Sequence, residues 1–186
     1  MKLSQLALIL GVVCALAHLY AVLQPAGCAA LLSRFPRNVP VGVFFTLLAT
    51  GWFEFNLNNS DISDFAEWKT LMLIALGVIG VGSCFYVQDY IAVRGGAAVA
   101  LLIADVVLDV QRLHSSGWKN VIAGWMYAWI IVSCWVVIQP WRVRDWINWA
   151  IKVPSRLRTL ALSGLAFGIF VAVLGLTVLG EGNLKN

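Results

Sequence analysis

Six runs of mostly apolar residues follow one another along the chain, and all five prolines fall between them. Each run approaches the roughly 20 residues that a helix needs to cross a bilayer. Because proline interrupts the interior of a helix, its absence from the runs favours six uninterrupted helices. We therefore expect transmembrane helices at about residues 3–23, 41–57, 70–87, 91–110, 121–138 and 160–179.

The composition excludes an ordinary soluble domain. Of the 186 residues, 61% are hydrophobic and 12% are charged, whereas soluble domains carry roughly 25% charged residues. Six spans of about 20 residues use most of the chain, so no room is left for a separate domain outside the membrane. We expect an all-α, polytopic integral membrane protein whose residues 1–186 form a single transmembrane helical domain.

The run at residues 91–110 is the doubtful span, because it contains Asp105 and Asp109. The excess of Lys and Arg on the cytoplasmic side of membrane proteins tests it. With six spans, eight Lys and Arg lie on one side and five on the other, whereas without this span the division becomes seven and six. The larger group consists of Arg34, Arg37, Arg94, Arg142, Arg144, Lys152, Arg156 and Arg158.

This asymmetry favours six spans, with both termini outside the cytoplasm. We expect the membrane to be a bacterial inner membrane, in which case both ends lie in the periplasm.

Residues 141–153 predict a short amphipathic helix in the plane of the membrane interface. Trp146, Trp149 and Val153 recur at helical intervals, and charged residues occupy another face. Tryptophan prefers the depth of the lipid headgroups, and cations are attracted to anionic lipid. The helix is either an anchor without a specific ligand or a platform for an anionic phospholipid or a cytoplasmic partner. The residues of this surface are Trp141, Arg142, Arg144, Trp146, Trp149, Lys152, Arg156 and Arg158.

Asp105 is the candidate residue for proton or ion binding. It shares a helix face with Asp109, four residues away, and a charged carboxylate in hydrocarbon costs about 2.5–3.5 kcal/mol. Asp109 lies near the end of the span and can pair with Arg112. Alternatively, Asp105 is a structural carboxylic acid bonded to a neighbouring helix. Its candidate partners there are Trp125, Tyr127, Trp129 and Ser133.

His18 is the candidate ligand for a bound cofactor of unknown identity. A single histidine can hold a haem or a related pigment, and two can hold a haem between them. His18 and His114 are expected to be separated by roughly 20 Å or more along the membrane normal, so we do not expect them to share a haem. The alternative for His18 is a hydrogen bond between helices. The cysteines form no C-x-x-C pair, and we expect no metal site.

The sequence contains no G-x-S-x-G, no H-E-x-x-H and no phosphate-binding glycine loop, which argues against catalysis. Gly164-x-x-x-Gly168 fits close packing of helices, within the chain or against a partner. We expect a non-catalytic subunit of a larger membrane complex that packs against partner helices, lipid or a hydrophobic cofactor. Its partners would be other membrane subunits and lipids, including anionic phospholipid, and not nucleic acid.

Two other functions stay open. The first is a small proton- or ion-coupled transporter or channel that uses Asp105. The second is an enzyme that acts on lipid with Asp105, Asp109 and His114 near the outer surface.

Overall fold

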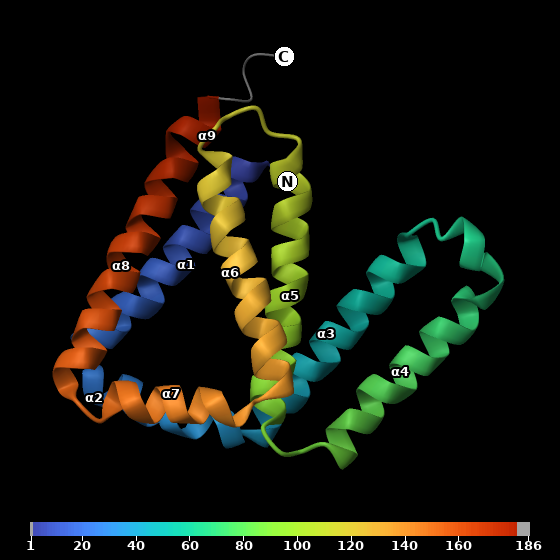
Figure 1. The fold of residues 1–186 in the computed structure, drawn as a ribbon, viewed down its shortest axis with the longest axis horizontal. Coiled ribbons are helices and arrows are strands. Elements are labelled where there is room, and N and C mark those ends of the chain that lie inside the picture. Colours follow the sequence, from blue (N-terminus) through green and yellow to red (C-terminus); the bar gives the residue numbers. More distant parts are fainter. Residues whose placement is uncertain (1, 182–186) are drawn as a thin grey trace. The chain divides into compact units, whose positions relative to one another are not determined.

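The computed structural model describes residues 2–181, and no residue in this range lies in a β-strand. Its elements in chain order are α1 (Leu3–Leu23), α2 (Pro25–Arg34), η1 (Phe35–Arg37), α3 (Val39–Asn59), η2 (Ser63–Trp68), α4 (Lys69–Tyr86), α5 (Ile91–Arg112), α6 (Lys119–Ile138), α7 (Trp141–Ile151), α8 (Pro154–Leu176) and α9 (Val178–Glu181) (Figure 1). The prediction of an all-helical chain is confirmed.

Five helices of the described range are long and apolar enough to cross a membrane. The length and composition of these helices are those of an integral membrane protein. They are Leu3–Leu23, Phe65–Tyr86, Ile91–Arg112, Lys119–Ile138 and Pro154–Leu176. The doubtful run with Asp105 is among them. α3 is not, although it has 21 residues, because Glu54 and several asparagines near its end lower its hydropathy.

Prolines lie at the beginnings of helices rather than in their interiors. Pro25, Pro40 and Pro154 occupy the first or second position of α2, α3 and α8, where the missing N–H would have no partner within the helix. The side chain of Asn38 caps α3 by accepting a hydrogen bond from the backbone N–H of Val41 at 3.3 Å. These positions explain why the helices begin where they do.

The structure differs most from the sequence prediction at α2 and α8. α2 was not predicted, since its ten residues contain no apolar run of membrane length. α8 begins at Pro154 rather than near residue 160 and ends at Leu176 rather than 179. Its first turns contain Arg156 and Arg158, which lower the local hydropathy, so the sequence predicted a loop there. Arginine is nevertheless a good helix former.

The chain divides into two compact units. Unit 1 consists of Met1–Ser33, Ala104–Ile131 and Asp145–Asn186, and unit 2 of Arg34–Ile103 and Val132–Arg144. The divisions fall within α2, α5, α6 and α7.

Unit 1 is built on an antiparallel pair formed by α1 and α8 (Figure 1). The two backbones approach closely through glycines: a Cβ atom on Gly168 would lie 2.6 Å from the backbone nitrogen of Ala15, and one on Gly175 would lie 2.8 Å from that of Leu8. Such close approach maximises van der Waals contact between helices. The prediction that Gly164 and Gly168 support close packing is confirmed, and the partner helix is α1.

Unit 2 contains the antiparallel hairpin of α3 and α4 (Figure 1). Gly77 of α4 lies against the carboxylate of Glu54, and Gly80 lies against the side chain of Thr50. The beginning of α5 packs on α3 in the same way, because Gly95 lies against Thr46. A small buried cluster holds α5 to the end of α6. It consists of Val93, Ala97 and Val136, with Phe35, Tyr90 and Val143 packed against it.

Candidate functional site

The imidazole of His18 lies in the interface of α1 and α8. Its Nδ1 is 2.8 Å from the backbone oxygen of Cys14, one turn earlier in α1, and its ring packs on Gly164 of α8, where a Cβ atom would overlap it. The thiol of Cys14 donates to the backbone oxygen of Gly164 at 3.7 Å. The hydrogen bond of His18 is therefore made within its own helix, and only its packing joins the two helices.

This bond determines which nitrogen of His18 carries a proton. A backbone oxygen can only accept, so Nδ1 must donate, and in the neutral ring Nε2 is then left with a free electron pair. Histidines that ligate metals often have this arrangement, in which the other nitrogen donates to a carbonyl. In this structure, however, Nε2 is one of the ring atoms packed against Gly164 of α8, so the nitrogen that could bind a cofactor faces the neighbouring helix.

His114 has no such free nitrogen. Its Nδ1 accepts from the backbone N–H of Ser116 at 3.2 Å, and its Nε2 lies 3.1 Å from the backbone oxygen of Leu179 in α9. Lys119 donates to the backbone oxygen of His114 at 2.6 Å. The residue therefore joins the α5–α6 loop to α9, which is a structural role.

Asp105 and Asp109 are both exposed on α5. Asp109 forms the expected ion pair with Arg112. Asp105 makes no hydrogen bond or ion pair with any residue between 2 and 181, and the expected bonds to Trp125, Tyr127 and Trp129 are not formed.

The aromatic side chains of α6 contact one another and α8 instead. The rings of Trp125 and Trp129 lie 5.5 Å apart edge to face, and Trp125 contacts Phe167 of α8 in the same geometry at 5.1 Å. The proposed structural role of Asp105 as a bonded acid within this chain is therefore not supported, and its carboxylate is available to a group from outside.

The helix predicted at residues 141–153 is present as α7, which ends at Ile151. Its protein-facing stripe is formed by Val143, Ile147 and Ala150, whereas Trp146 and Trp149 are exposed. The expectation that a tryptophan face would oppose a basic face is thus incomplete, since a third face of small and aliphatic residues packs inward.

Several residues of the basic surface have defined contacts. The guanidinium of Arg156 lies over the ring of Trp149 at 5.0 Å, which joins the beginning of α8 to α7 by a cation–π contact. Arg142 donates to the side chain of Gln139 at 3.2 Å, and Arg144 donates to the hydroxyl of Tyr90 at 3.2 Å. The remaining residues of this surface (Trp141, Lys152 and Arg158) are exposed.

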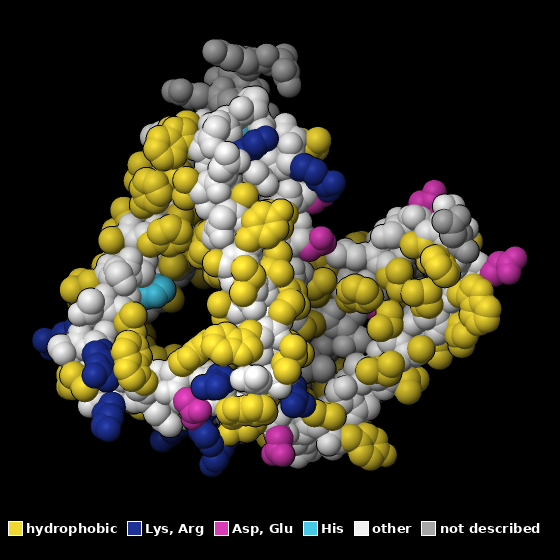
Figure 2. Space-filling model, viewed as in Figure 1, with side chains coloured by type: hydrophobic (Ala, Val, Ile, Leu, Met, Phe, Trp, Pro, Cys, Tyr) yellow, Lys and Arg dark blue, Asp and Glu magenta, His cyan; other side chains and the backbone are white. Residues whose placement is uncertain are grey.

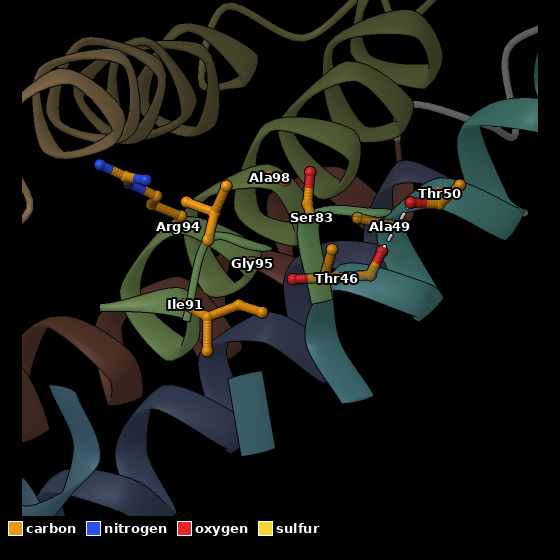
Figure 3. Close-up of a pocket in the computed structure, with 9 residues that line it drawn as sticks. Thr46, Ala49, Thr50, Ser83, Ile91, Arg94, Gly95 and Ala98 are labelled. Atoms are coloured by element: carbon orange, nitrogen blue, oxygen red, sulfur yellow. Dashed lines mark hydrogen bonds between the residues drawn. The ribbon is translucent and has the colours of Figure 1, made fainter. Parts of the chain in front are cut away.

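Unit 2 contains a cavity of about 350 Å³ that the sequence did not indicate. It lies where α3, the end of α4 and the beginning of α5 meet (Figure 3). The lining residues are Thr46, Ala49, Thr50, Ser83, Val87, Ile91, Arg94, Gly95 and Ala98. A cavity of this kind depends on which helices converge, so spacing along the chain gives no signal for it.

Most of unit 2's hairpin surface is apolar. Figure 2 shows hydrophobic side chains spread over α3 and α4. In the most apolar 18 residues of Phe65–Tyr86, only 11% are buried. Phe55, Val78 and Phe85 are each at least two-thirds exposed. An apolar surface of this extent is covered by lipid or by other helices.

No cluster of His, Cys, Asp and Glu in the described range could hold a metal ion. The four cysteines are free thiols, and partial burial raises the pKa of the Cys28 thiol in α2 above its usual range. Neither finding suggests a reactive thiol.

Comparison of the sequence with protein families and characterised proteins, and of the fold with solved structures, found no match.

Proposed function

We propose that this chain is a non-catalytic subunit of a larger membrane protein complex. The observation that carries the proposal is the position of Asp105, an exposed carboxylate about two turns from the end of a helix long enough to span the membrane, with no partner among residues 2–181. A carboxylate that faces lipid is costly, and such residues normally face protein or water. A hydrogen-bond donor or a cation from a neighbouring subunit would satisfy it.

We also propose six spans rather than five, with α3 as the sixth. α1 and α8 pack antiparallel, so they cross the membrane in opposite directions if both span it. A chain whose first and last spans run in opposite directions has an even number of spans. α3 makes the number even, and its antiparallel pairing with α4 supports this choice.

In the six-span topology both termini lie on the same side. The distribution of Lys and Arg described above supports a non-cytoplasmic location for both, in a bacterial inner membrane. α7 then lies at the cytoplasmic interface, where its exposed tryptophans and arginines suit lipid headgroups and anionic phospholipid in particular.

The alternative function is a small proton- or ion-coupled transporter or channel. The same exposed carboxylate would then be the residue that takes up the proton or cation. The lipid-enzyme hypothesis has no comparable support, because both ring nitrogens of His114 are engaged and Asp109 is paired with Arg112.

The test compares Asp105→Asn and Asp105→Leu with the matched control Asp109→Asn. Blue-native electrophoresis of membranes that contain the tagged chain should show a complex larger than the chain alone. A hydrogen bond between spans is worth about 1–2 kcal/mol, so Asp105→Leu should weaken association about five- to thirtyfold.

Asp109→Asn should leave the complex intact. If every variant assembles normally but Asp105→Asn abolishes ion or proton flux in proteoliposomes, the subunit proposal is wrong and transport takes its place.

A further inference from the structure

The cavity in unit 2 is lined by both apolar and hydroxyl-bearing side chains. Ala49, Val87 and Ala98 contribute apolar surface, and Thr46, Thr50 and Ser83 contribute hydroxyl groups (Figure 3). A volume of about 350 Å³ lies within the range of small-ligand sites, which runs from about 300 to 1,000 Å³. The cavity is open to the surface, so a ligand longer than the cavity could extend out of it.

Two of the three hydroxyl groups already use their protons. Thr50 donates to the backbone oxygen of Thr46 at 2.8 Å, and Ser83 donates to that of Ile79 at 2.7 Å. The hydroxyl of Thr46 makes no hydrogen bond with any residue in the described range. Thr46 is therefore the neutral donor that a ligand in the cavity would meet.

Arg94 is the cation of the site, and its Nε has no partner. This nitrogen is buried and makes no hydrogen bond with any residue that the structure describes. Figure 3 shows the guanidinium extending from α5 away from Thr46, Thr50 and Ser83. An unpaired buried donor on a charged group costs free energy, and phosphate oxygens satisfy a guanidinium with two parallel hydrogen bonds.

The position of Arg94 in α5 favours an anion further. It lies in the first turn of the helix, where the positive end of the helix dipole attracts negative charge. The backbone N–H groups of Ile91, Val93 and Arg94 are themselves bonded to the backbone oxygens of Gln88 and Tyr90. In a helix the Cα–Cβ bond tilts toward the N-terminus. The guanidinium is therefore directed toward the membrane surface at the beginning of α5, which is the depth of lipid phosphates.

The charge of unit 2 is separated between its two ends. All of its arginines lie just before α3, near the beginning of α5 or just after α6. They are Arg34, Arg37, Arg94, Arg142 and Arg144. The beginning of α3 lies at the same end of the unit as the end of α4 and the beginning of α5, because α3 and α4 form a hairpin. The buried cluster of Val93, Ala97 and Val136 holds the end of α6 there as well. Most of its acidic residues lie in or beside the loop at the other end of the hairpin. The net positive charge at this end attracts anions from a distance, whereas Arg94 is the one of these five arginines that lines the cavity.

We propose that this cavity binds one anionic phospholipid from the leaflet that faces the beginning of α5. Its phosphate pairs with Arg94, its glycerol ester accepts from the hydroxyl of Thr46, and its acyl chains leave through the opening of the cavity. This site is distinct from the basic surface of α7 and α8 and does not depend on assembly with other subunits.

The experiment is native mass spectrometry of the purified full-length chain during titration with phosphatidylglycerol, phosphatidylcholine or inorganic phosphate. Two variants alter the site: Arg94→Gln removes its charge, and Ala98→Phe fills the cavity without changing charge. Arg37→Gln is the charge-matched control outside the lining. A charged hydrogen bond is worth about 1.5–3 kcal/mol, so Arg94→Gln should weaken phosphatidylglycerol binding at least about tenfold.

Ala98→Phe should weaken binding to a similar degree, and Arg37→Gln should change it less than about twofold. If Arg94→Gln does not fold, as judged by its elution volume and thermal unfolding, Ala98→Phe alone decides the test. The proposal is overturned if the folded variants bind like the unmodified chain or if phosphatidylcholine binds equally well. The proposal would also be overturned if inorganic phosphate bound as tightly as phosphatidylglycerol, because the site would then take free phosphate rather than lipid.

Discussion

Gly11 of α1 and Gly168 of α8 face each other so closely that neither position has space for a side chain. A Cβ atom on Gly11 would lie 2.9 Å from the backbone oxygen of Gly168, and one on Gly168 would lie 3.0 Å from that of Gly11. The pair fixes the register of the two helices at the centre of unit 1.

Substitution of either glycine by alanine should therefore destabilise the protein. The added methyl group meets backbone atoms that cannot move without separating the helices, and overpacking of this kind costs about 1–3 kcal/mol. Thermal unfolding in detergent, followed with a thiol-reactive dye that reports the native cysteines, measures the change. Gly124→Ala is the matched control, since nothing lies within 4 Å of a Cβ atom there; equal stability of all three variants would refute this account of the helix pair.

The tautomer of His18 is a second prediction. Donation from Nδ1 to Cys14 requires a protonated Nδ1 and an unprotonated Nε2 in the neutral ring. The ¹⁵N chemical shifts of histidine-labelled protein at alkaline pH should show this form for His18 and the opposite form for His114, whose Nε2 donates to Leu179. Gly164→Ala should displace the ring of His18 and change its shifts, while those of His114 stay the same. A protonated Nε2 in His18 would remove it as a candidate cofactor ligand.

The number of spans is the third prediction. Because α1 and α8 are antiparallel, reporter tags at the two termini should lie on the same side of the membrane, and that side should be non-cytoplasmic. A cysteine placed at Asp61 should react with a membrane-impermeant reagent added to that side, and one placed at Asp89 should not. Termini on opposite sides would mean that α3 does not cross.

The fourth prediction concerns the basic surface of α7 and α8. Simultaneous replacement of Arg142, Arg144, Arg156 and Arg158 by glutamine should reduce the amount of anionic phospholipid that purifies with the protein, because each cation near the surface contributes about 1 kcal/mol. Lipid extraction and mass spectrometry give the ratio of lipid to protein. Since the cavity beside Arg94 is unchanged in this variant, about one anionic lipid per chain should remain. An unaltered lipid content would contradict the role proposed for this surface.

Much of the helical architecture can be predicted from the sequence, since the apolar runs and the prolines between them indicate the helices. The beginning of α8 was missed because Arg156 and Arg158 lower the hydropathy of turns that are nevertheless helical. The packing of Gly168 could be anticipated from its spacing to Gly164, but its partner Gly11 could not, because nothing in the spacing specifies which helix lies opposite.

The sites were less predictable for the same reason. The bonds of His114 to Ser116 and Leu179 depend on which elements become neighbours, and so does the lack of a partner for Asp105 within residues 2–181. The cavity beside Arg94 requires three helices to converge, and in the sequence Arg94 is only one more cation at the beginning of a span.

In the proposed function the chain works as part of a larger membrane assembly. Native mass spectrometry of the unmodified protein, gently extracted from its own membrane, should find the chain together with other polypeptides, in a complex whose stability depends on Asp105. A bare monomer or an assembly of identical chains would contradict it.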